Sequence, residues 1–211
     1  MTNLFKIEAG QQHAFMTKLA EAGLTAEMAK EVLKDGNIAA KMVAAITGAV
    51  TALLRHIGIV AVGPTEAFVA KERFTVDTGK EARARISFLS NNVKNWFGSK
   101  VEQAVGTERS LRYAELTTES VDAPILAELG PTTETTLSEI FALMERQKNG
   151  EEGVLLANGW ANIFYVKDVD GTLRAVLVRW DGDGWCVYAL EVMYPSRWFG
   201  GFRVFSRNPG A

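Results

Sequence analysis

Cysteine, histidine and proline are scarce in this chain of 211 residues, which has one cysteine, two histidines and five prolines. The single cysteine, Cys186, cannot form a disulfide within the chain, and this favours a reducing compartment. No Cys-x-x-Cys pair and no His-Glu-x-x-His motif occurs, so the sequence offers no standard zinc site. We therefore predict a cytoplasmic protein without a metal ion or another cofactor.

Long apolar runs and an excess of one charge are also missing. The least charged stretch, residues 42–54, ends at Arg55, whereas a membrane-spanning helix needs about 20 apolar residues. Residues 1–10 lack the charged-then-apolar layout of a secretory signal. The formal net charge is -2, so binding to nucleic acid or to an anionic membrane would need a local basic patch.

Sequence signatures of catalysis are equally hard to find. Gly200-Gly201 is isolated and precedes no predicted helix, so it does not form a phosphate-binding loop. Residues 181–184, Asp-Gly-Asp-Gly, lack the downstream glutamate of a calcium loop and fit a hairpin turn better. Cys186 lies between Trp185 and Val187 in a predicted strand, which favours a small buried side chain over a nucleophile. We predict no catalytic residue.

The first part of the chain, residues 1–58, is predicted to form a helical subdomain. Ala and Met are frequent there, Pro is absent, and apolar residues recur at spacings of three and four. Gly23 is a natural stop for a first helix, and Thr25 can cap a second helix that runs through Lys34. Asn37 can cap a third helix, which we expect to continue to about Arg55.

The rest of the chain, residues 59–211, is predicted to form a mixed α/β body. Short runs with strand character lie at residues 57–62, 68–76, 84–89, 111–116 and 124–129. A short helix is expected to begin at Asn91 or Asn92. Thr136 and Glu139 form a capping-box pattern, which predicts a helix whose apolar face begins at Leu137 and which ends near Gly150.

An antiparallel β-meander is predicted for residues 153–206. Turn signals recur about every ten residues, at 158–159 (Asn-Gly), 170–171 (Asp-Gly) and 181–184. The runs between them are rich in β-forming residues and span 154–157, 160–166, 173–180 and 185–192. A final run, 202–205, is expected to add an edge strand. The predicted fold class is α+β: a helical subdomain, then a body ending in a capped helix and the meander.

Several meander strands are apolar on both faces, which bears on function. In residues 173–180 one face carries Leu173, Ala175 and Leu177, and the other carries Val176, Val178 and Trp180. A sheet that is apolar on both faces must be covered on both. Two explanations are open. The capped helix and other parts of the chain cover both faces, or a protein partner covers one of them. A partner surface would leave a large exposed apolar patch.

The C-terminal run, residues 194–207, carries arginines and aromatics without an acid. Phosphate contacts from Arg197, Arg203 and Arg207 together with base stacking on Trp198 or Phe199 would suit single-stranded nucleic acid. This interpretation requires the three arginines to converge on one exposed face. The competing interpretation is an edge strand whose aromatics complete the core while its arginines face water.

Five segments are similar to a group of uncharacterised proteins from uncultivated, small-genome bacteria. They are FVAKERF (68–74), ARISFL (84–89), VDAPILAELG (121–130), the block 135–166 and VFSRN (204–208). The resemblance covers most of the chain from about residue 66. Ser90 departs from it, because this group has glycine there, and that affects the local turn alone. The resemblance implies a bacterial source and carries no activity, ligand or site residue.

The favoured function is non-enzymatic binding of another protein, or self-association, through the sheet or the helical subdomain. The alternative is nucleic-acid binding through Arg197, Trp198, Phe199, Arg203 and Arg207. An enzyme that uses scattered carboxylates ranks third, and it would need a deep pocket holding carboxylates of perturbed pKa.

Overall fold

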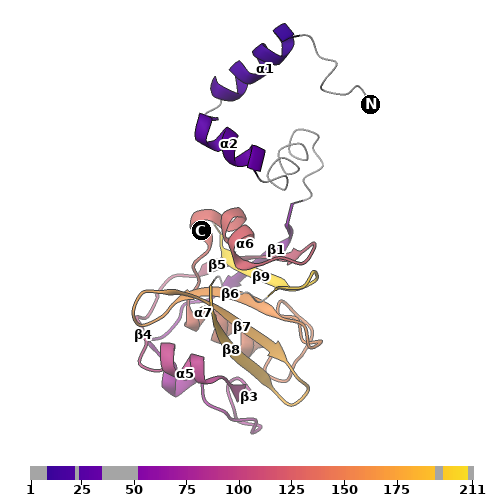
Figure 1. Cartoon of the computed structure of the whole chain (residues 1–211). Coiled ribbons are helices and arrows are strands. Elements are labelled where there is room, and N and C mark those ends of the chain that lie inside the picture. The colour runs from indigo at the N-terminus through magenta and orange to yellow at the C-terminus, as the bar shows by residue number, and fades with distance from the viewer. Residues whose placement is uncertain (1–8, 22–23, 35–51, 193–196, 209–211) are drawn as a thin grey trace. The chain divides into compact units, whose positions relative to one another are not determined.

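The computed structural model describes residues 9–21, 24–34, 52–192 and 197–208 (Figure 1). The chain divides into two compact units, Met1–Thr51 and Ala52–Ala211. The division therefore falls after Thr51 and not after residue 58. Residues 54–58 are extended and pair with a neighbouring strand, and the expected helix does not continue into them.

Two described helices belong to the first unit, α1 (Ala9–Glu21) and α2 (Ala26–Lys34). The predicted cap of α2 is confirmed, because the Thr25 hydroxyl accepts a hydrogen bond of 3.2 Å from the Met28 backbone N–H. Most of the predicted third helix lies in residues 35–51, outside the described residues.

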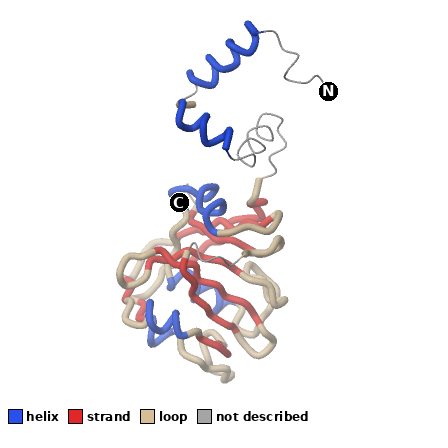
Figure 2. The backbone as a smooth tube through the Cα atoms, in the orientation of Figure 1, coloured by secondary structure: helices blue, strands red, loops and turns tan. Residues whose placement is uncertain are grey.

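The second unit is built on a mixed sheet, and the fold class is α+β, as predicted. Within the described residues the sheet has seven strands (Figure 2). Their order is β1 (Leu54–Val62), β5 (Arg109–Leu116), β9 (Arg203–Arg207), β6 (Asn162–Lys167), β7 (Leu173–Trp180), β8 (Trp185–Glu191) and β3 (Ile86–Leu89). Neighbours are antiparallel except the pairs β9–β6 and β8–β3. Strands β1, β3 and β5, from the first half of this unit, thus join the same sheet as the meander.

Helices and loops cover both faces of the sheet with two separate apolar clusters. On one face, α7 (Leu137–Arg146), α5 (Asn91–Phe97) and α4 (Ala70–Arg73) pack over the larger cluster. A short ribbon of β2 (Phe68–Val69) and β4 (Val101–Glu102) borders α4. On the other face, α6 (Asp122–Leu129) and the 3-10 turn Gly130–Thr132 lie over the smaller cluster. Internal elements therefore supply much of the two-sided coverage that the sequence demands.

The capped helix α7 begins as predicted. The Thr136 hydroxyl accepts from the Glu139 backbone N–H at 3.3 Å, and the Glu139 carboxylate accepts from the Thr136 N–H at 2.8 Å. The Glu102 carboxylate accepts from Leu137 and Ser138, both at 2.9 Å. The first backbone donors of α7 are thus satisfied, two of them by a side chain from distant β4.

The predicted meander is confirmed for β6, β7 and β8, which pair antiparallel in chain order. The prediction that the last run forms an edge strand is wrong. Strand β9 lies inside the sheet, antiparallel to β5 and parallel to β6. Val204 and Phe205 point to opposite faces and are both buried, Val204 in the smaller apolar cluster and Phe205 in the larger one.

Residues 154–157 are not a strand, contrary to prediction, because side-chain amides take their backbone hydrogen bonds. The Gln147 side chain accepts from the Leu155 N–H at 2.8 Å and donates to its carbonyl at 3.0 Å. Asn162 does the same for Leu156, at 2.8 and 3.1 Å. These backbone groups therefore have no need of a neighbouring strand.

Two other predicted strands are helical. Residues 124–129 belong to α6, where Pro124 lies in the first turn, a position that tolerates proline. Ile125 and Leu129, four residues apart, bury the same face of α6. Residues 68–76 contain a strand of two residues and then α4, whose Ala-Lys-Glu-Arg sequence consists of good helix formers.

The turn between β6 and β7 supports a first prediction. Gly171 has φ 81°, a left-handed conformation that L side chains rarely adopt, and an added Cβ would meet no atom within 4 Å. We expect Gly171→Ala to lower the free energy of unfolding by about 1 kcal/mol, from backbone strain alone. Gly106→Ala is the matched control, since Gly106 is equally open and lacks a positive φ. Equal denaturation midpoints for the two variants would contradict the prediction that a positive φ at Gly171 strains an alanine there.

Candidate binding site

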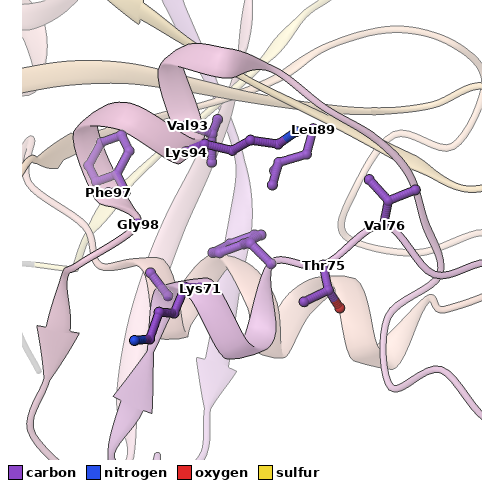
Figure 3. A pocket seen from close by; sticks show the side chains of 10 residues that line it. Lys71, Thr75, Val76, Leu89, Val93, Lys94, Phe97 and Gly98 are labelled. Atoms are coloured by element: carbon purple, nitrogen blue, oxygen red, sulfur yellow. The ribbon is translucent and has the colours of Figure 1, made fainter.

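A surface cavity of about 430 Å³ lies between α4 and α5 (Figure 3). Its lining is mostly apolar and comes from α4, the segment after it, the end of β3, and α5. The lining residues are Ala70, Lys71, Phe74, Thr75, Val76, Leu89, Val93, Lys94, Phe97 and Gly98. The volume is within the range of small-molecule and side-chain binding pockets.

The floor of this α4–α5 cavity is held rigidly by the core. Phe74 packs edge to face against Phe68 and Phe141, with ring centroids 5.8 and 5.6 Å apart. Phe97 and Val93 are buried in the larger apolar cluster. Ser90 caps α5, since its hydroxyl accepts from the Val93 N–H at 3.4 Å. The cavity is thus a preformed feature of packed elements.

The rim of the α4–α5 cavity is positive. Lys71 on α4 and Lys94 on α5 contribute ammonium groups that point in opposite directions in the view of Figure 3. No acidic side chain belongs to the lining, and neither lysine forms an ion pair with any residue that the structure describes. Val76 lines the cavity while 58% of its surface is exposed. The arrangement can bind an apolar group beside negative charge.

Three of the candidate nucleic-acid residues are adjacent in sequence but occupy different environments. Arg197 is exposed and pairs with Glu119 at 2.6 Å. Trp198 is buried, and its indole N–H donates to Asp122 at 2.8 Å. Phe199 is exposed and packs edge to face against Phe202. Trp198 is therefore part of the core and is not free to stack on a base.

The other two candidates, Arg203 and Arg207, lie on β9 and use their guanidinium groups within the protein. Arg203 donates to the carbonyls of Gly153, at 2.9 Å, and Val154, and lies 5.5 Å from the Tyr113 ring. Arg207 donates to the Glu134 carbonyl at 2.9 Å. They line two different cavities, so the five candidates do not gather on one exposed face.

The second face of the sheet remains partly open. Leu173, Leu177, Leu190 and Val192 pack against the smaller apolar cluster but are only partly buried. Phe88, on β3, is exposed and packs against Tyr188 with ring centroids 5.1 Å apart. The presence of these apolar side chains on the second face agrees with the sequence pattern, in which the strands are apolar on both faces. The sequence does not predict the α4–α5 cavity, because the strand expected over residues 68–76 would replace α4.

Cys186 is buried, as the sequence suggested, and it contacts polar partners. Its thiol donates to Asp181 at 2.9 Å, and Ser87 lies 3.5 Å away. Burial, followed by the hydrogen bond to Asp181, raises the pKa of the Cys186 thiol. The Asp181 carboxylate also accepts from the backbone of Asp183 and Gly184, both at 3.2 Å. Residues 181–184 are thus a hairpin turn with a neutral thiol beside it.

Comparison with protein-family models, with curated proteins and with solved structures finds no match. In the described part of the chain, no three or more His, Cys, Asp or Glu side chains group as metal ligands would. No helix among the described residues is both long and apolar enough to cross a membrane. The resemblance to the bacterial group remains a prediction.

Proposed function

We propose that this is a non-enzymatic binding protein that recognises an apolar, acidic segment of another protein. The observation that carries the proposal is the α4–α5 cavity, which combines an apolar floor, a rim with Lys71 and Lys94, and a lining without acids. An apolar side chain would fill the cavity, and carboxylates flanking it would meet the lysines. We further propose a bacterial, cytoplasmic protein.

A protein segment suits this site for two reasons. The cavity opens at the surface beside Val76, so apolar contact can continue beyond the cavity itself. The lysines stand on different elements, and their ammonium groups point apart, which suits charges spaced along a chain better than one compact anion (Figure 3). Apolar anchors inserted into a pocket with a charged rim are a common mode of peptide recognition.

The proposal is tested by fluorescence anisotropy with labelled peptides that carry a central Leu-Phe pair flanked by glutamates. Peptides flanked by lysines, or with Ser-Ser in place of Leu-Phe, serve as matched probes. We expect the acidic apolar peptide to bind, and Lys94→Glu to weaken its binding about tenfold through loss of attraction and gain of repulsion. Val76→Ser should weaken binding severalfold through lost apolar contact.

Arg179→Glu is the matched control. Arg179 is exposed on β7 and lies on the opposite face of the sheet from the α4–α5 cavity, so the same change of charge should leave peptide binding unchanged. If Arg179→Glu and Lys94→Glu weaken peptide binding equally, the effect comes from the net charge of the protein. That result would contradict binding at the α4–α5 cavity. Octanoate binding that depends on Lys94, without binding of any peptide, would assign the cavity to a small molecule and overturn the proposal.

A further inference from the structure

Another cavity, of about 200 Å³, lies beside the first turn of α7, and every residue that lines it is polar or charged, so it is called the polar cavity below. It is formed where the start of β5, the end of β9 and the first turn of α7 meet. Its lining residues are Thr107, Glu108, Arg109, Ser110, Glu139, Arg207 and Asn208. One water molecule takes up about 30 Å³ of liquid, so this polar cavity has room for more than a single water.

Glu139 lines the polar cavity and carries a buried acceptor oxygen without a hydrogen bond. Its side chain is 2% exposed, and one carboxylate oxygen, Oε2, is used in the capping box with Thr136. The other oxygen, Oε1, has no hydrogen-bond partner among the residues that the structure describes. The guanidinium groups of Arg109 and Arg207 form ion pairs with Oε1 at 3.6 and 3.9 Å, and both distances are beyond hydrogen-bond distance. A buried oxygen of this kind requires a donor.

The charges around the polar cavity indicate which kind of ligand group can donate a hydrogen bond to Glu139 Oε1. Its lining carries two guanidinium groups, from Arg109 and Arg207, and two carboxylates, from Glu108 and Glu139. A cationic donor would meet the guanidinium groups, and a simple anion would meet the carboxylates. A neutral group is repelled by neither set of charges. It fits if it has an N–H that donates to Glu139 and, beside it, a carbonyl that accepts from the guanidinium groups. Amides and lactams have this pair of atoms on one edge.

We propose that the polar cavity binds a small neutral ligand through an amide or lactam edge. The ligand N–H donates to Glu139 Oε1, and its carbonyl accepts from Arg109 and Arg207. The Ser110 hydroxyl and the Asn208 side chain, which lie 3.4 Å apart, border the same space. The site is separate from the α4–α5 cavity and does not depend on the function proposed for it.

The test is a titration of the full chain, followed by amide and arginine Nε–H chemical shifts in heteronuclear NMR. Uracil and nicotinamide are the neutral probes, and acetate and methylammonium are the charged ones. We expect the neutral probes to shift the resonances of Arg109, Ser110 and Arg207 in a saturable way. Glu139→Gln should weaken this binding about tenfold, because the acceptor of the ligand N–H loses its charge.

Glu134→Gln is the matched control, since the Glu134 side chain pairs with Lys167 and does not line the polar cavity. It should leave the affinity for uracil unchanged. Resonances that stay in place with uracil and nicotinamide would mean that water alone fills the cavity, and would overturn the proposal. Saturable shifts with acetate alone would show that the polar cavity binds an anion, and would overturn the proposal equally. Both results come from the wild-type chain, so neither depends on the folding of a variant.

Discussion

Asp122→Ala is expected to lower the free energy of unfolding by about 3–5 kcal/mol, the largest effect of any substitution proposed for this protein. The Asp122 residue is 2% exposed, and its Oδ1 accepts from the Tyr165 hydroxyl at 2.7 Å and the Trp198 indole N–H at 2.8 Å. Burial, followed by the charge of Asp122, raises the pKa of Tyr165, so this hydroxyl stays protonated and donates. Without the carboxylate, two buried donors lose their acceptor.

Chemical denaturation of three variants measures this effect. Tyr165→Phe removes one donor and leaves the acceptor bound to Trp198, so we expect it to cost about 1–2 kcal/mol, well below Asp122→Ala. Asp183→Ala, an exposed position in a hairpin turn, should change stability by less than about 0.5 kcal/mol. A loss below about 1 kcal/mol for Asp122→Ala would show that the buried pair of hydrogen bonds contributes little.

Asp168→Ala is expected to cost about 2–4 kcal/mol, because one buried carboxylate organises the turn between β6 and β7. The Asp168 side chain is 1% exposed and accepts from the backbone N–H groups of Asp170, at 3.0 Å, and Thr172, at 2.9 Å. It also accepts from Arg174 Nε at 2.8 Å. Arg174 in turn lies over the Trp96 ring of α5, 4.0 Å from its centroid. Loss of the carboxylate should therefore loosen both the turn and the contact with α5.

The same carboxylate predicts a pH dependence. Burial by itself raises the pKa of Asp168, but the hydrogen bonds from Arg174, Thr172 and Asp170 outweigh burial, and the net result is a lowered pKa. A lowered folded-state pKa means that the stabilisation is present above the unfolded value of about 3.9 and is lost as pH falls through the folded value. Wild-type stability should thus fall more steeply in acid than that of Asp168→Asn.

Denaturation midpoints measured from neutral pH into acid test this prediction. Asp170→Ala is the control within the same turn, because the Asp170 side chain is exposed, and it should stay within about 0.5 kcal/mol of wild type at every pH. Parallel pH profiles for the wild type and Asp168→Asn would contradict the role assigned to Asp168.

Local signals in the sequence predicted a good part of the fold. The capping box of Thr136 and Glu139 and the cap at Thr25 each involve residues three apart, so the sequence contains both partners. The Asp-Gly turn at 170–171 and the apolar strands around it likewise located β6, β7 and β8. Where both partners of an interaction lie within a few residues, the pattern and the structure agree.

The candidate site was much harder to predict, because its residues are set by contacts between distant segments. Trp198 reads as an exposed aromatic among arginines, and only its contact with Asp122, far away in the chain, places it in the core. Gln147 and Asn162 turn a strand-like run into a loop by side-chain hydrogen bonds that no periodicity encodes. The α4–α5 cavity depends on which faces of two short helices meet.

The sequence by itself determined an α+β chain with a capped helix, the part of the predicted meander that forms β6, β7 and β8, and apolar side chains on both faces of its strands. Only the tertiary structure decided that β9 enters the sheet between β5 and β6. It also decided that Arg203 and Arg207 line separate cavities and that Glu139 is buried beside Arg109 and Arg207. The physical reason is that periodicity and capping report interactions within one turn or hairpin, whereas strand order and side-chain convergence are settled by packing among segments far apart in the chain.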